Sequence, residues 1–233
     1  MIDVLYIVGT GSKFGNKELL YSLRSLDKYG KNIDRLIISG ECPDFIDKDK
    51  IVYVKSEDIS TPSVNHWHKV RCAFKETDSK KVLLMYDDIF FCKETDLENY
   101  PYYYRGDLPE QDRIAKWGHI QYKARQWLEA HKYPTKHYGI HLPMIYERGK
   151  FMQLTSVFES MAKTGGVSVR SIYGNVYVTG ATNRDDVKLF TDFCQFDVWL
   201  RDKECFSTAP ENFGKGPLKW LTTEFPNKSR WEK

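Results

Sequence analysis

The chain has 233 residues, of which 41% are hydrophobic and 29% are charged, a balance that argues against a disordered or fibrous protein. Its 35 basic and 32 acidic side chains leave a formal net charge of +3, which permits an anionic ligand but does not indicate a protein that coats nucleic acid. No apolar run reaches the roughly 18 residues of a membrane span, so we expect no membrane partner. The five scattered cysteines form no C-x-x-C pair and predict reduced thiols in a cytoplasmic protein: Cys42, Cys72, Cys92, Cys194 and Cys205.

The first 90 residues alternate between short β-rich runs and amphipathic helical patterns. Leucines at helical spacing predict a helix over 16–29, and large apolar residues on one face predict a second helix over 65–76. Four apolar runs predict strands, at residues 2–8, 35–39, 51–54 and 81–86. Strands that alternate with helices predict a mainly parallel, Rossmann-like α/β sheet with flanking helices. In such sheets ligands gather beyond the carboxyl ends of the strands.

The second half of the sequence is less regular. Apolar spacing predicts a helix over 112–131, with Trp117 on its buried face, and another over 150–163 that ends at a pair of glycines. After Gly180 the pattern breaks into short, loop-like pieces, so we expect an irregular C-terminal part. No repeat or linker divides the chain, which predicts a single domain over residues 1–233.

Two adjacent carboxylates, Asp87 and Asp88, end the apolar pattern at 81–86, and large hydrophobic residues follow them. Burying one carboxylate beside another costs free energy unless a cation or a shared proton compensates. A hard divalent cation bound through oxygen atoms, with a diphosphate completing its shell, removes that cost. The plainer interpretation is a turn at the strand end, where Asp is common. Because ligands gather at this end of a sheet, the pattern favours the metal site.

A turn of small residues, Gly9-Thr10-Gly11-Ser12, follows the first predicted strand and precedes a helix. Its backbone amides are placed to meet a nucleotide phosphate or ribose. The turn has neither the G-x-G-x-x-G spacing nor a G-K-[ST] ending, so a dinucleotide fingerprint and a P-loop are not indicated. A plain tight turn is an equally good interpretation.

Two residues of the second half carry groups suited to transfer chemistry. His141 can act as a general base or orient a phosphate, although a histidine before an apolar segment is more often structural. Arg170 can supply positive charge to a leaving diphosphate, although an isolated arginine is a weak signal.

Read together, these pieces resemble the Stealth family of capsular-polysaccharide sugar-phosphate transferases. The second conserved region of that family opens on E-L-x-x-x-L-R-S-x-x-x-Y and closes on N-D-D-x-F, and the chain is similar to it from Ser12 to Phe91. His141 resembles the histidine of the third region, and Arg170 resembles the arginine that follows it. Residues 225–232 resemble the closing F-P-x-x-S-x-x-E of the family.

The chain departs from this family in three ways. Tyr86 stands where the family has the Asn of N-D-D, and the first conserved region, with its W-V-D segment, is reduced to residues 3–9. The chain is also shorter than typical members. Plain glycosyl transfer on a trimmed scaffold is therefore as good an interpretation as transfer of a sugar-1-phosphate. The compact, Lys- and Tyr-rich style also resembles small transferases of tailed phages, some of which decorate modified bases in their own DNA.

The resemblance implies a nucleotide-diphosphosugar-transferase-like (GT-A-like) fold and a metal-dependent transferase that moves a sugar from a nucleotide sugar to a hydroxyl. It implies that residues 1–91 bind the nucleotide sugar and that residues 92–233 form the acceptor and catalytic half. Mg²⁺ or Mn²⁺ would be held by Asp87 and Asp88. The other implied roles are catalytic for Asp88, His141 and Arg170, and nucleotide-binding for Gly9, Thr10, Gly11, Arg24, Asn65 and Lys69.

Two other classes of function remain open. A non-catalytic module that binds nucleotide sugars is favoured by Tyr86, and a nucleic-acid-binding protein is favoured only by the net charge and the 15% aromatic residues. The resemblances imply an acceptor that is a glycan or a polyanion such as modified phage DNA. In the basic segment 116–136, Lys116 and Lys123 face away from the apolar stripe, which predicts either a solvated face or a surface that guides a polyanionic acceptor.

Overall fold

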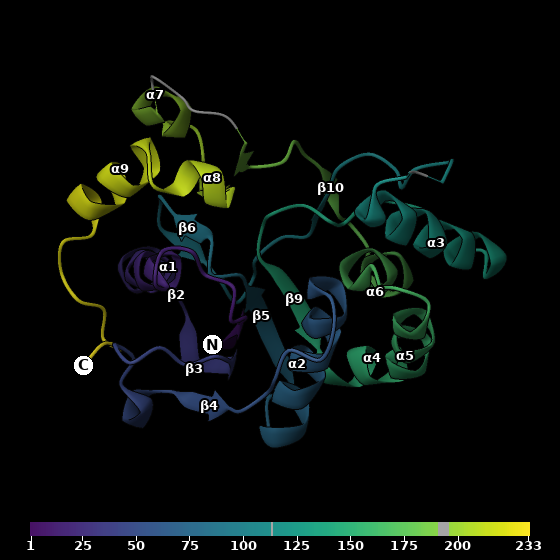
Figure 1. Cartoon of the computed structure of the whole chain (residues 1–233), viewed down its shortest axis with the longest axis horizontal. Coiled ribbons are helices and arrows are strands. Elements are labelled where there is room, and N and C mark those ends of the chain that lie inside the picture. The colour runs from purple at the N-terminus through teal and green to yellow at the C-terminus, as the bar shows by residue number, and fades with distance from the viewer. Residues whose placement is uncertain (113, 191–195) are drawn as a thin grey trace.

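A five-stranded sheet in the order β4-β3-β1-β5-β9 forms the centre of the molecule (Figure 1). The computed structural model describes residues 1–112, 114–190 and 196–233. Strands β4, β3, β1 and β5 run parallel to one another, whereas β9 is antiparallel to β5. The mainly parallel sheet predicted from the sequence is thus confirmed. Its strands are β1 (Ile2–Val8), β3 (Ile33–Gly40), β4 (Val52–Val54), β5 (Lys81–Met85) and β9 (Met144–Glu147).

Helices α1 (Lys17–Tyr29) and α2 (Pro62–Glu76) cover opposite faces of this sheet (Figure 1). Successive side chains of a strand point to opposite faces, so one strand feeds two cores. Along β1, Tyr6 packs in the same buried cluster as the leucines of α1, whereas Leu5 packs with the apolar side chains of α2. Helix α2 begins three residues before the predicted helix because Pro62 fits the first turn, where an N–H has no partner to lose.

Four helices of the second half extend the core on the α2 side of the sheet: α3 (Lys116–Ala130), α4 (Arg148–Gln153), α5 (Thr155–Lys163) and α6 (Val169–Tyr177). The single helix predicted over 150–163 is two helices, because the backbone leaves helical geometry at Leu154, where ψ is 0°. The chain leaves α5 through Gly165 and Gly166. A Cβ on Gly166 would lie 2.4 Å from Ile120, so this turn brings α3 close to the start of α6.

The part of the chain after Gly180 consists of short elements, as predicted. Strand β12 (Cys205–Thr208) lies between β11 (Lys188–Leu189) and β6 (Ile89–Phe91) in a second sheet. Its core contains Phe90 of β6, which is tilted against Phe206 of β12 and stacked on Phe213 of one of the helices above the sheet. Those helices are α7 (Phe196–Leu200), α8 (Pro210–Phe213) and α9 (Gly216–Glu224). The remaining short elements are β2 (Gly30–Lys31), η1 (Lys48–Lys50), β7 (Thr95–Asp96), β8 (Tyr103–Tyr104) and β10 (Thr182–Asn183).

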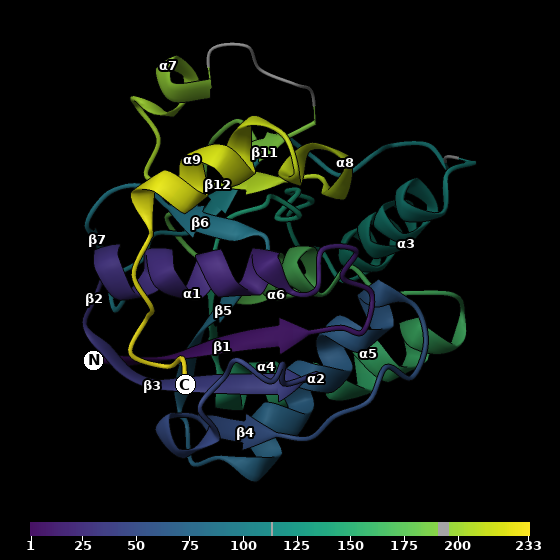
Figure 2. The same ribbon diagram turned by 60° about the vertical axis from the view of Figure 1, so that its left-hand side comes forward.

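Residues 225–233, which we name the C-terminal strap, run from α9 across α1 to the loop before η1 (Figure 2). The carboxylate of Glu232 accepts hydrogen bonds from Nε and Nη2 of Arg24 at 2.9 and 2.8 Å. The amide of Asp47 donates to the carbonyl of Trp231 at 2.8 Å. These hydrogen bonds therefore attach the C-terminal strap both to α1 and to the loop before η1.

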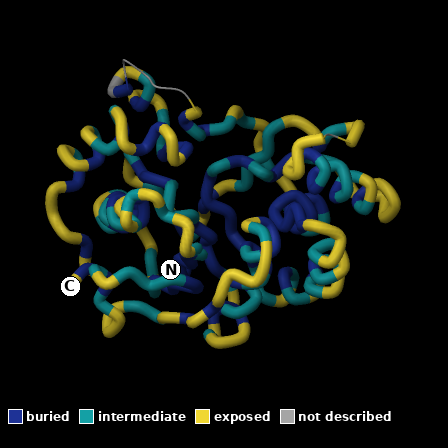
Figure 3. Tube along the Cα trace, viewed as in Figure 1, coloured by how far each residue is buried: buried dark blue, intermediate teal, exposed yellow. Residues whose placement is uncertain are grey.

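The sheets and the inner faces of the helices are buried, and the outer turns are exposed (Figure 3). Among the described residues, no helix has the length and apolar character needed to cross a membrane. The cysteines in the described ranges are free thiols, and Cys194 lies outside those ranges.

Candidate active site

Two cavities adjoin each other at the carboxyl ends of β1 and β5. The larger has a volume of about 510 Å³ and is lined by the turn at 9–13 together with Glu18, Asp58, Asn65 and Lys69; we name it the polar cavity. The smaller, of about 330 Å³, we name the aromatic cavity, and its own lining includes Trp117, His141, Ser168 and Arg170. The wall common to both is formed by Pro62, His66, Tyr86, Asp87, Asp88 and Lys188. A ligand in one cavity can therefore contact a ligand in the other.

The acidic pair lies at this common wall, in the turn that joins β5 to β6. The turn is fixed because β5 belongs to the central sheet and β6 to the second sheet. Oδ2 of Asp88 accepts hydrogen bonds from Nζ of Lys188 at 3.1 Å and from Oγ of Ser207 at 2.9 Å. Burial, the charge of Asp88 and the charge of Glu18 raise the pKa of Asp87 to about 7. The pair therefore forms a site of negative potential that a bound cation would stabilise.

The carboxylates of Asp87 and Asp88 supply the hard oxygen ligands that Mg²⁺ and Mn²⁺ prefer. Within the described ranges, no group of three His, Cys, Asp or Glu side chains is arranged to hold a metal ion. A divalent cation at the pair would thus take two protein carboxylates and complete its shell with oxygen atoms of a ligand or water. The residues fit a cation shared with a bound anion, and Mg²⁺ in particular is commonly held in this way.

The floor of the polar cavity is built by contacts between three segments. Thr10 donates to Oδ2 of Asp58 from its amide and its hydroxyl, each at 3.2 Å. Nζ of Lys69 lies 2.7 Å from Oδ1 of Asp58 and donates to the carbonyl of Val8. Oδ1 of Asn65 accepts the amides of residues 59 and 60, both at 2.9 Å. These contacts hold the turn after β1 against the start of α2 and keep the cavity open between them.

His141 at the aromatic cavity is held by Asp186. Nδ1 of His141 lies 2.8 Å from Oδ2 of Asp186, and the amide of His141 donates to Oδ1 at 3.0 Å. Nη1 of Arg105 donates to the same carboxylate at 2.7 Å. Burial raises the pKa of Asp186, but the hydrogen bond and charge of His141, together with Arg105, outweigh it and lower that pKa to about 2. An ionised carboxylate only accepts, so Nδ1 carries the hydrogen and Nε2 is left as the basic nitrogen.

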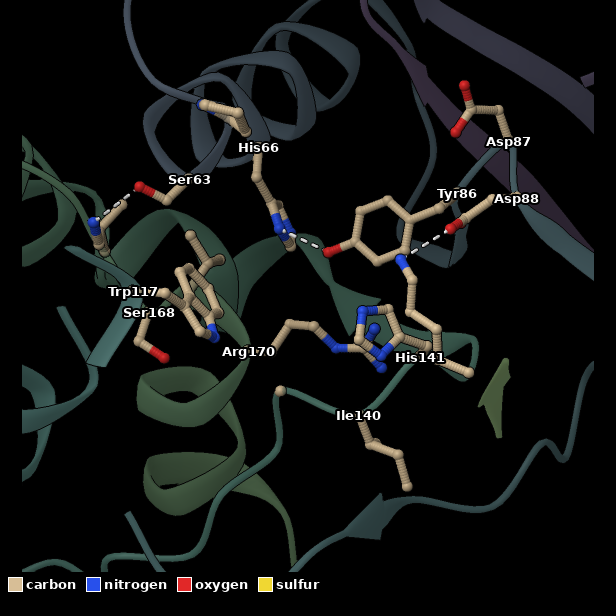
Figure 4. A pocket seen from close by; sticks show the side chains of 15 residues that line it. Ser63, His66, Tyr86, Asp87, Asp88, Trp117, Ile140, His141, Ser168 and Arg170 are labelled. Carbon is tan, nitrogen blue, oxygen red and sulfur yellow. Dashed lines mark hydrogen bonds and ion pairs between the residues drawn. The ribbon is translucent and has the colours of Figure 1, made fainter. Parts of the chain in front are cut away.

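Arg170 extends from the first turn of α6 towards the loop that carries Ile140 and His141 (Figure 4). Its Nη2 donates to the carbonyl of Leu142 at 2.5 Å, and its guanidinium lies 5.7 Å from the centre of the Tyr86 ring. The hydroxyl of Tyr86 lies 2.9 Å from Nδ1 of His66. Burial and the charge of Arg170 lower the pKa of His66 to about 3, so this imidazole is neutral.

Most residues predicted from the sequence come together at these cavities. Gly9, Thr10, Gly11, Asn65 and Lys69 line the polar cavity, His141 and Arg170 line the aromatic cavity, and Asp87 and Asp88 line both. Arg24 is not brought there: it lines a separate depression beside the C-terminal strap and pairs with Glu232. Lys116 is exposed on α3, and Lys123 donates to the carbonyl of Thr164 at 3.0 Å.

Sequence reasoning missed several residues of the site, among them Asp186, Lys188 and Trp117. Asp186 and Lys188 lie in the irregular part after Gly180, where no periodic pattern marks them. Trp117 was placed on the buried face of a helix, but it is 46% exposed because it lies in the first turn of α3, at the rim of the aromatic cavity.

Comparison with known proteins shows what this fold resembles. No family model matches the chain, and no curated protein matches its sequence. The structure of galactosyltransferase LgtC in complex with donor and acceptor sugar analogues is similar over 98% of both chains, with 10% identity and a TM-score of 0.50. A structure of an active-site mutant of LgtC gives the same coverage and identity and a TM-score of 0.51. The chain has the GT-A fold of these glycosyltransferase structures, as expected from the sequence. The resemblance to the Stealth family stays a prediction.

Proposed function

We propose that the chain is a glycosyltransferase that moves a sugar from a nucleotide sugar to a hydroxyl of an acceptor. The observation that carries this proposal is the meeting of the polar and aromatic cavities at Asp87 and Asp88. In a GT-A fold this is the carboxyl end of the sheet, where ligands bind. Two substrates held in adjacent cavities can react at the wall between them. The first half of the chain would thus supply most of the donor side, and the second half most of the acceptor side.

The polar cavity would hold the nucleotide sugar. The turn at 9–13 lines the cavity, and the turn between a strand and a helix together with Lys13 would supply donors and positive charge that suit phosphate and ribose oxygens. Gly9, Thr10, Gly11 and Asn65 would line the nucleotide. Lys69 is 3% exposed and paired with Asp58, so its role would be to hold the shape of the cavity and to add positive charge at its floor.

Asp87 and Asp88 would hold Mg²⁺ or Mn²⁺ at the common wall, against the diphosphate of the donor. When bound, the cation neutralises charge that grows on the diphosphate as the nucleotide leaves. Lys188 already places a fixed positive charge 3.1 Å from Asp88. Because it lines both cavities, this ammonium would also face the leaving group from the acceptor side.

The acceptor hydroxyl would enter from the aromatic cavity and give its proton to Nε2 of His141. Its oxygen would form a bond to the anomeric carbon as the bond from that carbon to the diphosphate oxygen breaks. The electron pair of the broken bond leaves with the nucleoside diphosphate. Asp186 keeps Nδ1 protonated and stabilises the imidazolium that forms, which is the role of the carboxylate in a catalytic triad.

The test of this proposal is turnover with a panel of nucleotide sugars, Mn²⁺ and simple glycoside acceptors. Release of nucleotide and the mass of the product are measured, with Asp88→Asn as the inactive control. Sugar transfer adds one sugar residue, whereas transfer of a sugar-1-phosphate gives a product heavier by one further phosphate. Binding of a nucleotide sugar without hydrolysis or transfer, under all these conditions, would instead mark a non-catalytic binding module.

A further inference from the structure

The aromatic cavity contains a buried positive charge, that of Arg170, for which the described part of the chain provides no ion-pair partner. Arg170 is 7% exposed, and its Nε has no hydrogen-bond partner among the described residues. Two carboxylates near the cavity are engaged by other cations: Asp186 pairs with Arg105 and His141, and Asp88 pairs with Lys188. The third, Asp87, also lines the cavity but forms no ion pair with Arg170 in the described part of the chain. A buried guanidinium that lacks an anion is unfavourable, because desolvation is not offset by a charge partner. A ligand that brings an anionic group would supply the missing partner.

The beginning of α6 is a second, independent feature of the same cavity. Ser168, the N-cap residue, makes no capping hydrogen bond through its side chain, and residues 167–170 line the cavity. The first amides of a helix have no acceptor within the helix, and the helix dipole favours negative charge at this end. The uncapped N-terminal turn of this nine-residue helix thus lies at the same cavity that Arg170 lines.

The geometry separates this positive end from the acidic pair. Arg170 and Ser168 line the aromatic cavity and are absent from the lining of the polar cavity. In Figure 4 the ring of Tyr86 lies between Arg170 and the two aspartates. An anion held by Arg170 would therefore belong to the molecule in the aromatic cavity. Trp117 at the rim offers an exposed aromatic face on which a sugar ring can stack.

We propose that the aromatic cavity binds an acceptor sugar that carries a carboxylate or a phosphate. The anionic group is held by the guanidinium of Arg170 and by the amides at the start of α6, while the sugar ring lies against Trp117. This proposal rests on the proposed function, because it names the acceptor class of the same site. It assigns Arg170 to recognition of the acceptor and not to the diphosphate of the donor.

The test is a ligand-observed NMR titration of the protein with matched neutral and anionic sugars. Methyl β-D-glucuronide is compared with methyl β-D-glucoside, and glucose 6-phosphate is compared with glucose, so that carboxylate and phosphate are separated. We expect at least one anionic sugar to bind tenfold or more tightly than its neutral partner. In Arg170→Gln this ratio should fall to within twofold. Arg71→Gln is the matched control, because Arg71 is a half-buried arginine of α2 outside both cavities, and it should keep the tenfold ratio.

A second variant keeps the test independent of how well Arg170→Gln folds. Ser168→Asp places a carboxylate at the N-cap of α6, a position that accepts Asp readily, and fills the anion site from within the protein. It should also reduce the ratio to within twofold. A wild-type ratio near one for both sugar pairs, or a tenfold ratio that survives in both variants, would overturn the proposal.

Further arms separate this proposal from its alternatives. A ten-nucleotide single-stranded DNA is titrated in parallel, and if only its binding depends on Arg170, the anionic-sugar proposal is wrong and a nucleic-acid acceptor replaces it. Turnover of nucleotide sugars is measured separately. If no donor is turned over but binding of a sugar acid depends on Arg170, the proposed function fails and the anion site stands. If Arg170→Gln transfers to neutral and anionic acceptors as the wild type does, the anion site fails and the proposed function stands.

Discussion

His141 and the carboxylate of Asp186, 45 residues apart in the sequence, are joined by two hydrogen bonds at the edge of the aromatic cavity. One joins Nδ1 to Oδ2 at 2.8 Å, and the other joins the amide of His141 to Oδ1 at 3.0 Å. The pair fixes both the orientation of the ring and the nitrogen that carries its hydrogen. Asp186 therefore acts through His141 as a positioning residue.

We expect Asp186→Asn to lower kcat by tenfold or more, since general-base catalysis contributes roughly 10²- to 10⁴-fold and depends on the correct tautomer. The KM for the donor should change little, because Asp186 does not line the polar cavity. Steady-state kinetics with the donor and acceptor found in the turnover screen measure both constants. Asp185→Asn is the matched control, because Asp185 is an exposed neighbour. Equal kcat in the two variants would remove His141 and Asp186 from the mechanism.

The same residue predicts how stability depends on pH. The folded-state pKa of Asp186 is about 2, below its ordinary value of 3.8, so the unfolded chain binds this proton more readily than the folded protein does. Asp186 therefore stabilises the fold by about 2 kcal/mol above pH 4, and this contribution is lost as the pH falls from 4 to 2. Urea denaturation should show the largest difference between wild type and Asp186→Asn at neutral pH. A difference that is unchanged at pH 2.5 would contradict this ionic role.

Asp88→Asn should abolish the stabilisation by metal and donor together. A donor present at 100 times its Kd adds about 2.7 kcal/mol to the wild type. The variant keeps an oxygen for Lys188 and Ser207 but removes one of the two carboxylates that would hold the cation. Thermal shift with a nucleotide sugar, with and without Mn²⁺, measures this loss. Asp44→Asn is the matched control and should behave as the wild type, because Asp44 is an exposed aspartate distant in sequence from Asp88. Metal-dependent stabilisation retained in Asp88→Asn would show that the cation site is elsewhere.

Two glycine substitutions test the packing that supports the loop of His141. A Cβ on Gly174 of α6 would lie 2.5 Å from the buried ring of Tyr138, whereas a Cβ on Gly149 of α4 would have no atom within 4 Å. We expect Gly174→Ala to lower the free energy of unfolding by about 1–3 kcal/mol through overpacking. Gly149→Ala should raise it by up to about 1 kcal/mol, because alanine favours the helix. Urea denaturation of both variants measures this, and equal effects would mean that the ring of Tyr138 moves aside without cost.

The parts of the fold that sequence patterns predict are those in which each element is determined by its own residues. The helix at α1 and the strand at β5 have strong periodic patterns, and the structure places them within one residue of the predicted bounds. Strand β9 carries no such signal. It has four residues, follows Pro143, and becomes a strand because it pairs with β5 at the sheet edge. Leu154 likewise ends a helix in a stretch whose apolar pattern continues without a break.

The residues of the candidate site likewise divide into those that a local sequence pattern indicates and those that only the folded structure brings together. Asp87 and Asp88 could be singled out because adjacent carboxylates after an apolar strand are costly without compensation. The partners of these residues could not, because Lys188 reaches Asp88 across 100 residues and no local pattern encodes that contact. Arg24 is the opposite case, a residue that a sequence motif indicated but that the structure places outside the site. Its place in a family-like motif suggested a nucleotide, but its partner in the structure is the carboxylate of Glu232.

That ion pair has a consequence for the kinetics of folding. Arg24 and Glu232 are 208 residues apart, so bringing them together from the unfolded chain costs roughly 5 kcal/mol of loop-closure entropy. We expect a contact between residues so far apart in the sequence to form late in folding, after the sheet has already brought α1 and α9 near each other. Substitutions in the C-terminal strap should therefore speed unfolding and leave the refolding rate unchanged. The C-terminal strap would thus affect the lifetime of the folded state, which the unfolding rate sets, and not the rate of folding.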